Sequence, residues 1–300
     1  MGLLGLAAQA APDPWQDVDL TATVSIANMS AKPVRQHQFR LTLPDDVGSH
    51  QKVLSVRLPE YPRFEWKTHT NQVDRYAQGQ LRLEANSQVT LKFQVRLRLT
   101  VTDARLNPGD ARSAGNANFL RPTTFVESSA PEIRALATRL MAQASDDETR
   151  LRAAFFYPQR TLSYRRDMDN RGALFALREH YGDCTEYAAL FVATARAMGY
   201  PARLTSEFRF EGDEDMDQPN HHAAEVFLRE RWIPVDPNLA TAPKLGYGFG
   251  TTGMQKIVLK RDGSWVWASA TPELTANERR RWIQTRVQWQ VRRAQTEPRP

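Results

Sequence analysis

The sequence predicts an α+β protein, in which an N-terminal antiparallel β-sandwich is followed by a second domain of mixed helix and strand. Three stretches of pattern support this prediction. From about residue 18 to 102, apolar and polar residues alternate with period two, which is typical of half-buried antiparallel strands. Between about 130 and 200 the apolar spacing becomes that of amphipathic helices. From 221 onward the alternation of strands returns.

We expect the β-sandwich domain to span residues 18–106. Its clearest strand is the run 91–101, in which leucine, phenylalanine and valine alternate with lysine, glutamine, arginine and threonine. A second alternating run covers 20–26, and turn-rich segments such as Leu43-Pro44-Asp45-Asp46 separate the strands. Several strands at this spacing indicate a sandwich. No group of catalytic residue types lies within it.

The second expected domain spans residues 107–300 and opens with a linker of small and polar residues at 107–116. Two of its helices have candidate capping residues, Ser129 for the first and either Ser145 or Asp146 for the second. The expected helices before the first catalytic motif are 130–141, 146–156 and 173–180.

Strands are expected again near the C-terminus. The runs 257–260 and 265–267 flank Asp262-Gly263, a dipeptide typical of tight turns, and so predict a hairpin. The run 283–291 contains several arginines that also fit a basic helix. Its apolar residues nevertheless alternate with polar ones, which predicts a strand with a solvated face.

Composition limits the classes of function. The 300 residues suit two domains of ordinary size, and 41% hydrophobic residues are enough for a packed core. The net charge of +6 comes from arginines spread along strand-like runs, so we expect no nucleic-acid partner. No apolar run approaches the roughly 18 residues of a membrane-spanning helix, so no integral membrane segment is expected. A single cysteine excludes an intramolecular disulfide and a multi-cysteine zinc site. We expect no metal and no cofactor.

The N-terminus carries the pattern of an export signal. Ala8-Gln9-Ala10 has the small-x-small form of a secretory cleavage site and follows a short apolar stretch. That stretch lacks preceding basic residues and is shorter than usual. We therefore interpret residues 1–17 as a truncated signal segment and leader, which predicts a periplasmic or secreted protein. The alternative is an alanine-rich terminus without a targeting role.

The only cysteine, Cys184, lies where a nucleophile is expected. It begins an amphipathic helix that ends near Gly199. A cysteine in the first turn of a helix meets unpaired backbone N–H groups and the positive end of the helix dipole, which both favour the thiolate. The same N–H groups can stabilise an oxyanion. Asp183 is unfavourable for a thiolate, so we expect it to cap the helix or to point away.

A histidine pair and an aspartate follow on a predicted hairpin. The hairpin consists of strands 221–228 and 232–236 with a turn at Arg229-Glu230. Because side chains alternate along a strand, His221 and His222 point to opposite faces and only one can serve a site. The pairing places Asp236 opposite His221 to within about one pair, close enough for a hydrogen bond. Either histidine alone would be interpreted as a surface residue or a satisfied core residue.

Together these blocks resemble the transglutaminase-like superfamily over about residues 125–240. The blocks are Gly182-Asp183-Cys184-Thr185-Glu186-Tyr187-Ala188, Ala197-Met198-Gly199-Tyr200-Pro201-Ala202-Arg203, His221-His222-Ala223-Ala224-Glu225-Val226 and Trp232-Ile233-Pro234-Val235-Asp236-Pro237. The resemblance implies a papain-like core, in which a helix bearing the cysteine packs on an antiparallel sheet bearing the histidine and the aspartate. It further implies Cys184 as nucleophile, His221 as base and Asp236 as the residue that orients the base. The family's histidine lies four residues before the glutamate of its block, which selects His221 and leaves His222 as the second choice.

The sequence departs from the family's pattern in two places. Ala223 occupies a position where the family usually has an aromatic residue, which opens the site or changes what packs on the imidazole. No clear side-chain donor for an oxyanion precedes Cys184, and Tyr164 is a weak candidate that we expect in the core instead. The acidic loop 211–217 is expected to be solvated. Its alternatives are attraction of a lysine or polyamine acceptor and weak binding of calcium.

The leading hypothesis is a cysteine-dependent acyl-transfer enzyme that acts on amide bonds of a protein or peptide through a thioester. Resolution of the thioester by water gives a protease or amidase, whereas resolution by an amine gives cross-linking. One alternative is a non-catalytic β-sandwich protein for binding or adhesion, with a relic catalytic domain. Another is a biosynthetic amide synthase that takes a carrier-bound thioester, which an export signal would disfavour.

Overall fold

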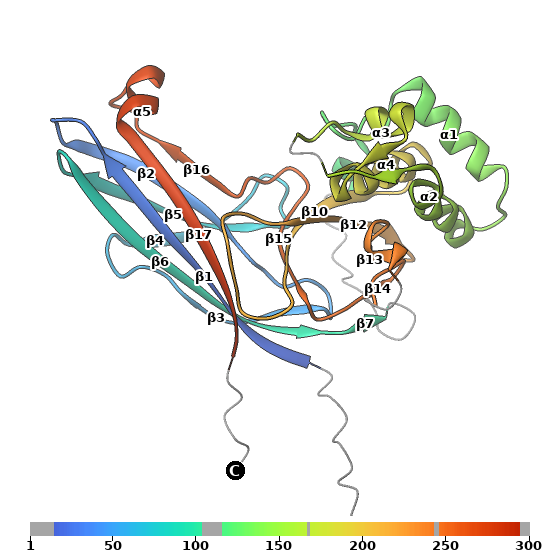
Figure 1. Cartoon of the computed structure of the whole chain (residues 1–300), viewed down its shortest axis with the longest axis horizontal. Helices are drawn as coiled ribbons and strands as arrows, with labels where there is room; N and C mark the ends of the chain where they lie inside the picture. The colour runs from blue at the N-terminus through green and yellow to red at the C-terminus, as the bar shows by residue number, and fades with distance from the viewer. Residues whose placement is uncertain (1–14, 104–115, 167–168, 243–245, 295–300) are drawn as a thin grey trace, which may run out of the picture.

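The computed structural model describes residues 15–103, 116–166, 169–242 and 246–294, and it confirms the α+β class. Two antiparallel sheets form a sandwich, and a third antiparallel sheet carries helices on one face (Figure 1). The expected leader before residue 15 and most of the expected linker lie outside the described residues. Within the described ranges, no helix has the length and apolar character needed to cross a bilayer.

The first sheet of the sandwich is built around two long neighbouring strands, β1 and β6. The sheet has the order β11, β17, β1, β6, β3, with bounds Glu214–Met216, Ile283–Arg293, Trp15–Asn28, Ser87–Thr100 and Gln51–Arg57. The predicted alternation is confirmed in β6, where Leu91, Phe93 and Val95 are buried and the residues between them are more exposed. One face of this sheet therefore lies in the core and the other meets solvent.

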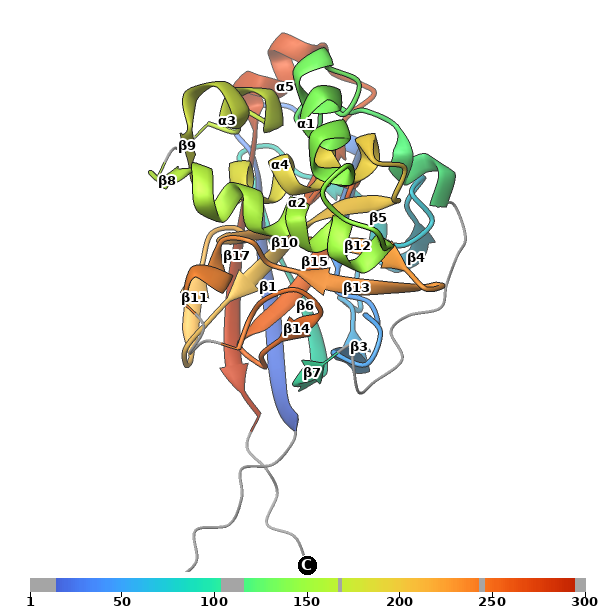
Figure 2. The same ribbon diagram turned by 90° about the vertical axis from the view of Figure 1, so that its right-hand side faces the viewer.

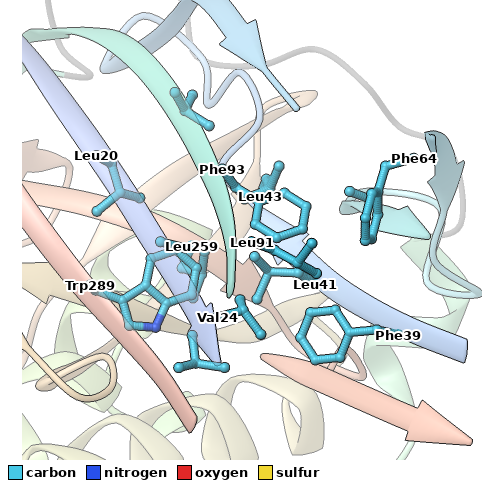
Figure 3. Packing of buried hydrophobic residues seen from close by; sticks show 14 of the residues in the cluster. Leu20, Val24, Phe39, Leu41, Leu43, Phe64, Leu91, Phe93, Leu259 and Trp289 are labelled. Carbon is cyan, nitrogen blue, oxygen red and sulfur yellow. The ribbon is translucent and has the colours of Figure 1, made fainter. Parts of the chain in front are cut away.

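The second sheet packs its apolar face on the first. Its order is β16, β2, β5, β4, with bounds Trp267–Ala270, Val34–Leu43, Arg75–Leu83 and Phe64–Thr68. Phe64 of β4 and Phe93 of β6 meet edge to face, with ring centroids 4.9 Å apart. Leu41 and Phe39 of β2 lie in the same core (Figure 3). This packing confirms the expected N-terminal β-sandwich.

The last strands of the chain lie in the N-terminal sheets. β17 pairs with β1, and β16 pairs with β2. Trp289 of β17 is 1% exposed and packs in the sandwich core (Figure 3). These pairings differ from the expected division into 18–106 and 107–300. We propose instead a sandwich unit that comprises residues 15–103 together with β16 and β17.

The predicted hairpin across Asp262-Gly263 is wrong. β15 (Lys256–Arg261) pairs with β10 in the third sheet, whereas β16 belongs to the sandwich. A turn does form, with Gly263 at φ +85°. The chain after it is held by the sandwich, because the ring of Trp265 packs on those of His69 and Tyr76. Contacts distant in the sequence thus outweigh the local hairpin signal.

The third sheet carries the predicted His–Asp hairpin. Its order is β13, β12, β10, β15, and the first three strands span Arg231–Val235, His221–Leu228 and Ala202–Arg209. Arg229 and Glu230 form the predicted turn, both with positive φ. Four helices cover one face of this sheet, and the sandwich lies toward the other (Figure 2). The helices are α1 (Pro131–Met141), α2 (Asp147–Thr161), α3 (Ala173–Glu179) and α4 (Cys184–Ala197).

The helix starts test the predicted caps. α2 begins after Asp146, whose side chain accepts the backbone N–H of Thr149 at 3.0 Å, as expected, but the helix continues beyond residue 156. The N-cap of α1 is Ala130 without a side-chain bond, so the prediction of Ser129 is wrong. The remaining elements are β7 (Thr102–Asp103), β8 (Ser163–Tyr164), β9 (Tyr181–Gly182), β14 (Thr251–Thr252), η1 (Asn116–Leu120), η2 (Leu239–Thr241) and α5 (Ala276–Trp282).

Candidate active site

Cys184 is the first residue of α4, and the segment before it is shaped by a capping box. The side chain of Asp183 accepts the backbone N–H of Thr185 at 2.8 Å, and Glu186 accepts the backbone N–H of Asp183 at 3.1 Å. Asp183 therefore caps the helix, as expected. A Cβ on Gly182 would lie 2.3 Å from the Cβ of Glu186, so only glycine fits there. The close approach of Gly182 to Glu186 and the capping bond of Asp183 explain why glycine and aspartate precede Cys184.

Helix α4 is held rigidly behind the cysteine. Every residue from Thr185 to Arg196 is buried between the sheet and the other helices. The hydroxyl of Tyr187 donates to the carbonyl oxygen of Leu162 at 2.7 Å. The helix ends at the C-cap Met198, followed by Gly199 at φ +93°, which matches the predicted end. The start of the helix, and with it Cys184, is thus fixed in position.

The structure brings Cys184, His221 and Asp236 together. Nε2 of His221 lies 2.8 Å from Oδ2 of Asp236, and both side chains are almost fully buried. Cys184 lies close enough to the imidazole to help raise its pKa. Because Asp236 uses Nε2, the nitrogen left for Cys184 is Nδ1. The other carboxylate oxygen of Asp236 accepts the backbone N–H of Leu239 at 2.8 Å, which fixes the carboxylate.

In the buried His221–Asp236 pair, each side chain stabilises the charged form of the other. Burial alone would lower the pKa of His221, but the charge and hydrogen bond of Asp236, with that of Cys184, raise it to about 10. Burial by itself raises the pKa of Asp236, yet the neighbouring His221 holds that pKa below its ordinary value. The pair therefore exists as imidazolium and carboxylate at neutral pH.

His222 has a different environment, as the alternation of the strand predicts. Its Nδ1 lies 3.1 Å from Oγ of Ser206, on β10. Burial lowers the pKa of His222 to about 4, with further contributions from Lys260 and His221. His222 is therefore neutral at pH 7 and makes no bond with Asp236, whereas His221 does.

A solvent-open cleft of about 460 Å³ lies beside Cys184. Asn220 fixes one wall, because its side chain pairs with both the N–H and the carbonyl of Arg209, at 2.7 and 2.8 Å. The lining residues of the cleft are Arg166, Asp183, Cys184, Thr185, Met216, Asp217, Gln218, Pro219, Asn220 and His222.

The structure shows where Tyr164 and Ala223 lie, the two residues noted above in connection with departures from the family's pattern. Tyr164 is 59% exposed on β8, next to Gly182 of β9, so the expectation that it lies in the core is wrong. Partial burial raises the pKa of Tyr164, and the charges of Cys184 and Asp183 raise it further. Ala223 is fully buried opposite Thr205. No aromatic side chain is therefore supplied from that position to the imidazole.

The acidic loop is tied to the last strand rather than fully solvated. Its residues 214–216 form β11, which pairs with β17. Arg292 of β17 forms an ion pair with Asp215, and the backbone N–H of Arg293 donates to Asp213 at 2.9 Å. These contacts offset part of the acidic charge, which weakens the hypothesis of an amine-attracting loop.

Two buried residues near His221 were missed in the sequence. Glu207 of β10 and Lys256 of β15 form an ion pair of 3.0 Å, with both side chains at most 3% exposed. A signal was present, since Arg203, Thr205 and Glu207 fall on one face of a strand that alternates. A charged face on an interior strand indicates buried partners.

Comparisons with known proteins agree with this geometry. Residues 134–237 match the model of the transglutaminase-like superfamily. No protein among the curated sequences matches the chain. A solved structure of a "putative cysteine protease" from Cytophaga hutchinsonii superposes with a TM-score of 0.60 at 17% identity, covering 95% of this chain and 93% of that one. At this identity the likeness shows a shared fold, which includes the sandwich.

Two further solved structures superpose less well. The periplasmic domain of TgpA from Pseudomonas aeruginosa gives a TM-score of 0.39 at 16% identity, covering 74% of this chain and 88% of that one. A "putative protease" from Parabacteroides distasonis gives 0.32 at 14% identity, covering 70% and 42%. The family match and the shared fold lead to one conclusion: residues 134–237 of this chain form a domain of the transglutaminase-like superfamily.

Proposed function

We propose that this protein is a cysteine-dependent acyl-transfer enzyme that acts on amide bonds, with Cys184 as nucleophile, His221 as acid and base, and Asp236 as the orienting residue. The observation that carries the proposal is the contact of one imidazole with both the thiol and a buried carboxylate. A nucleophile, a base and a group that orients the base are the parts of a covalent acyl-transfer site.

The proposed reaction proceeds in two halves. The sulfur of Cys184 attacks the amide carbonyl carbon, and the backbone N–H of Cys184 at the helix start is positioned to stabilise the oxyanion. His221 then gives its proton to the leaving amine, the C–N bond breaks, and a thioester forms. Water or a second amine attacks the thioester and loses its proton to His221. The acyl product leaves, and the thiolate–imidazolium pair is restored.

We favour hydrolysis over cross-linking. Asp213 and Asp215 of the acidic loop are engaged by the last strand and do not line the cleft beside Cys184. The protein from Cytophaga hutchinsonii with the shared fold is described as a "putative cysteine protease". The substrate class is therefore a protein or peptide whose chain lies in the cleft beside Cys184. Given the Ala8-Gln9-Ala10 pattern, we further propose a periplasmic or secreted location.

Variants of the three residues and of His222 test the proposal. Cys184→Ala should abolish activity on an unfolded protein substrate without changing the fold. His221→Ala should lower the rate by about 10²- to 10⁴-fold, the usual loss for an acid–base residue, whereas the matched control His222→Ala keeps substantial activity. New peptide termini would indicate hydrolysis, and incorporation of a labelled primary amine would indicate cross-linking. Equal loss in both histidine variants would contradict the assignment.

The competing hypothesis, a β-sandwich binding protein with a relic second domain, predicts a different result. In that case alkylation of Cys184 by iodoacetamide would be slow and would not change in His221→Ala. The proposed enzyme predicts rapid alkylation that slows when His221 is removed, because the imidazolium no longer stabilises the thiolate.

A further inference from the structure

The face of the third sheet opposite the helices carries a group of buried charges. Glu207 lies opposite His221 on neighbouring strands, and both are at most 4% exposed. One carboxylate oxygen of Glu207, a ring nitrogen of His221 and a carboxylate oxygen of Asp236 all lie within 4.8 Å of one another. His221 is therefore close to two carboxylates.

Glu207 is held firmly by its own partners. Its Oε1 accepts the hydroxyl of Thr205 at 2.7 Å and the ammonium of Lys256 at 3.0 Å. Its Oε2 is buried and accepts no hydrogen bond from the described part of the chain. Tyr247 is nearby and uncharged, since burial and the carboxylate of Glu207 raise its pKa. Glu207 is therefore held through Oε1, while Oε2 has no hydrogen-bond partner among the described residues.

The charges balance only when His221 is protonated. Asp236 and Glu207 each bring one negative charge and Lys256 brings one positive charge, so a neutral imidazole leaves a net negative charge in a buried space. An imidazolium makes these four groups neutral while Cys184 is a thiol, and it offsets part of the excess negative charge when Cys184 is a thiolate, so burial favours the protonated ring. The titratable or charged groups that face His221 or these partners are Cys184, Asp183, His222, Asp236, Glu207, Lys256, Lys260, Arg209, Tyr247 and His50.

The sandwich holds the strand that supplies Lys256. β15 is the edge strand of the third sheet, and side chains of the sandwich occupy its open edge. The side-chain amide of Gln51 accepts from the N–H of Val258 at 2.9 Å and donates to its carbonyl at 3.0 Å. His50 lies 3.2 Å from the carbonyl oxygen of Lys256, and Asp74 accepts the N–H of Arg261 at 2.8 Å. These bonds occupy backbone groups of β15 that a neighbouring strand would otherwise pair with.

We propose that Glu207 is a positioning residue of the active site, which acts with Asp236 to hold His221 as the imidazolium that the cysteine chemistry requires. Lys256 keeps Glu207 in place, and the sandwich keeps Lys256 in place. Glu207 touches neither the sulfur nor the substrate in this scheme. The inference rests on the proposed function, but it predicts a property of His221 that is measurable without substrate.

The experiment is an NMR pH titration of the His221 ring in the full chain. Its signal among the six histidines is assigned by its loss in His221→Gln. Glu207→Gln keeps the shape and removes the charge, and should lower the pH of deprotonation by about 1 unit or more, the usual effect of a close opposite charge. The matched control removes another buried ion pair of the same sheet face, with Arg203→Met and Glu225→Gln together, and should leave the His221 titration unchanged.

Two outcomes would overturn the inference. One is that the pH of deprotonation of His221 does not change in Glu207→Gln. The other is that this pH falls equally in the control that removes Arg203 and Glu225. If Glu207→Gln does not fold, the double variant with Lys256→Met removes the whole pair and leaves no buried charge unpaired. The double variant should still lower the pH at which His221 loses its proton, by less than a folded Glu207→Gln variant would. An unchanged pH of deprotonation would overturn the inference. Failure of the proposed function would be distinct, because Cys184 would then be inert while His221 still responded to Glu207.

Discussion

The buried His221–Asp236 pair predicts a pH dependence of folding stability whose sign is fixed by the structure. The pKa of His221 is raised from its ordinary value of 6.5 to about 10 in the folded chain. Between these values the folded chain holds a proton that the unfolded chain releases. The contribution of the pair is therefore fully present below pH 6.5 and is lost as the pH rises through about 10.

The size of this effect follows from the same shift. Each pKa unit corresponds to about 1.4 kcal/mol, so the full shift sets an upper limit of about 5 kcal/mol on the contribution of the pair. Removal of one partner from a buried ion pair costs about 3–5 kcal/mol in other proteins. His221→Gln should therefore reduce the free energy of unfolding by several kcal/mol at pH 6, and by much less near pH 10.

Urea unfolding of the wild type and of His221→Gln, at intervals from pH 6 to 10, measures this difference. Both proteins are compared in a Cys184→Ala background, so that titration of the thiol does not contribute. The gap between the two free energies of unfolding should narrow steadily as the pH rises. A gap that stays constant over this range would refute the reasoning, because it would mean that the folded chain does not retain the proton on His221 that the unfolded chain releases.

Two further predictions concern the frame around the site. Gly182→Ala should destabilise the chain by about 1–3 kcal/mol, because the new Cβ meets Glu186 and small-to-large changes in packed regions cost that amount. In the control Gly212→Ala the new Cβ meets no atom within 4 Å, so the melting temperature should be nearly unchanged. Trp289→Ala should cost about 3–5 kcal/mol by chemical denaturation, since the ring is buried against Phe208, and a cost below 1 kcal/mol would show that the last strand is not part of the core.

Local patterns were sufficient to predict most elements and the contact of His221 with Asp236. Alternation identified β6 and β17 because each has one apolar face in the core and one polar face in solvent. Turn chemistry identified the hairpin from His221 to Asp236, because Arg229 and Glu230 leave only two residues between the strands. The separation of His221 from His222 followed from the period of a strand alone.

What the sequence did not reveal depends on contacts between distant segments. β15 and β16 were predicted as a hairpin, but each finds its partner in a different sheet. Glu207 and Lys256 lie 49 residues apart, and neither has a motif of its own. Their pairing depends on the register of β10 with β15, which includes an irregularity between Ser206 and Glu207. No local pattern encodes such a register.

Cys184, His221 and Asp236 lie within the segment that matches the family, but the proposed support of His221 extends beyond it. That segment ends at residue 237, whereas Lys256 lies beyond it and the sandwich closes the edge of its strand. Leu259 and Ile257 of the same strand are buried in the core of the sandwich (Figure 3). β15 therefore has its apolar residues in the sandwich core, while its lysine pairs with Glu207 in the third sheet. If β15 shifts relative to the sandwich, Lys256 moves with it. Because Lys256 holds Glu207 in the proposed arrangement, such a shift also changes the electrostatic environment of His221.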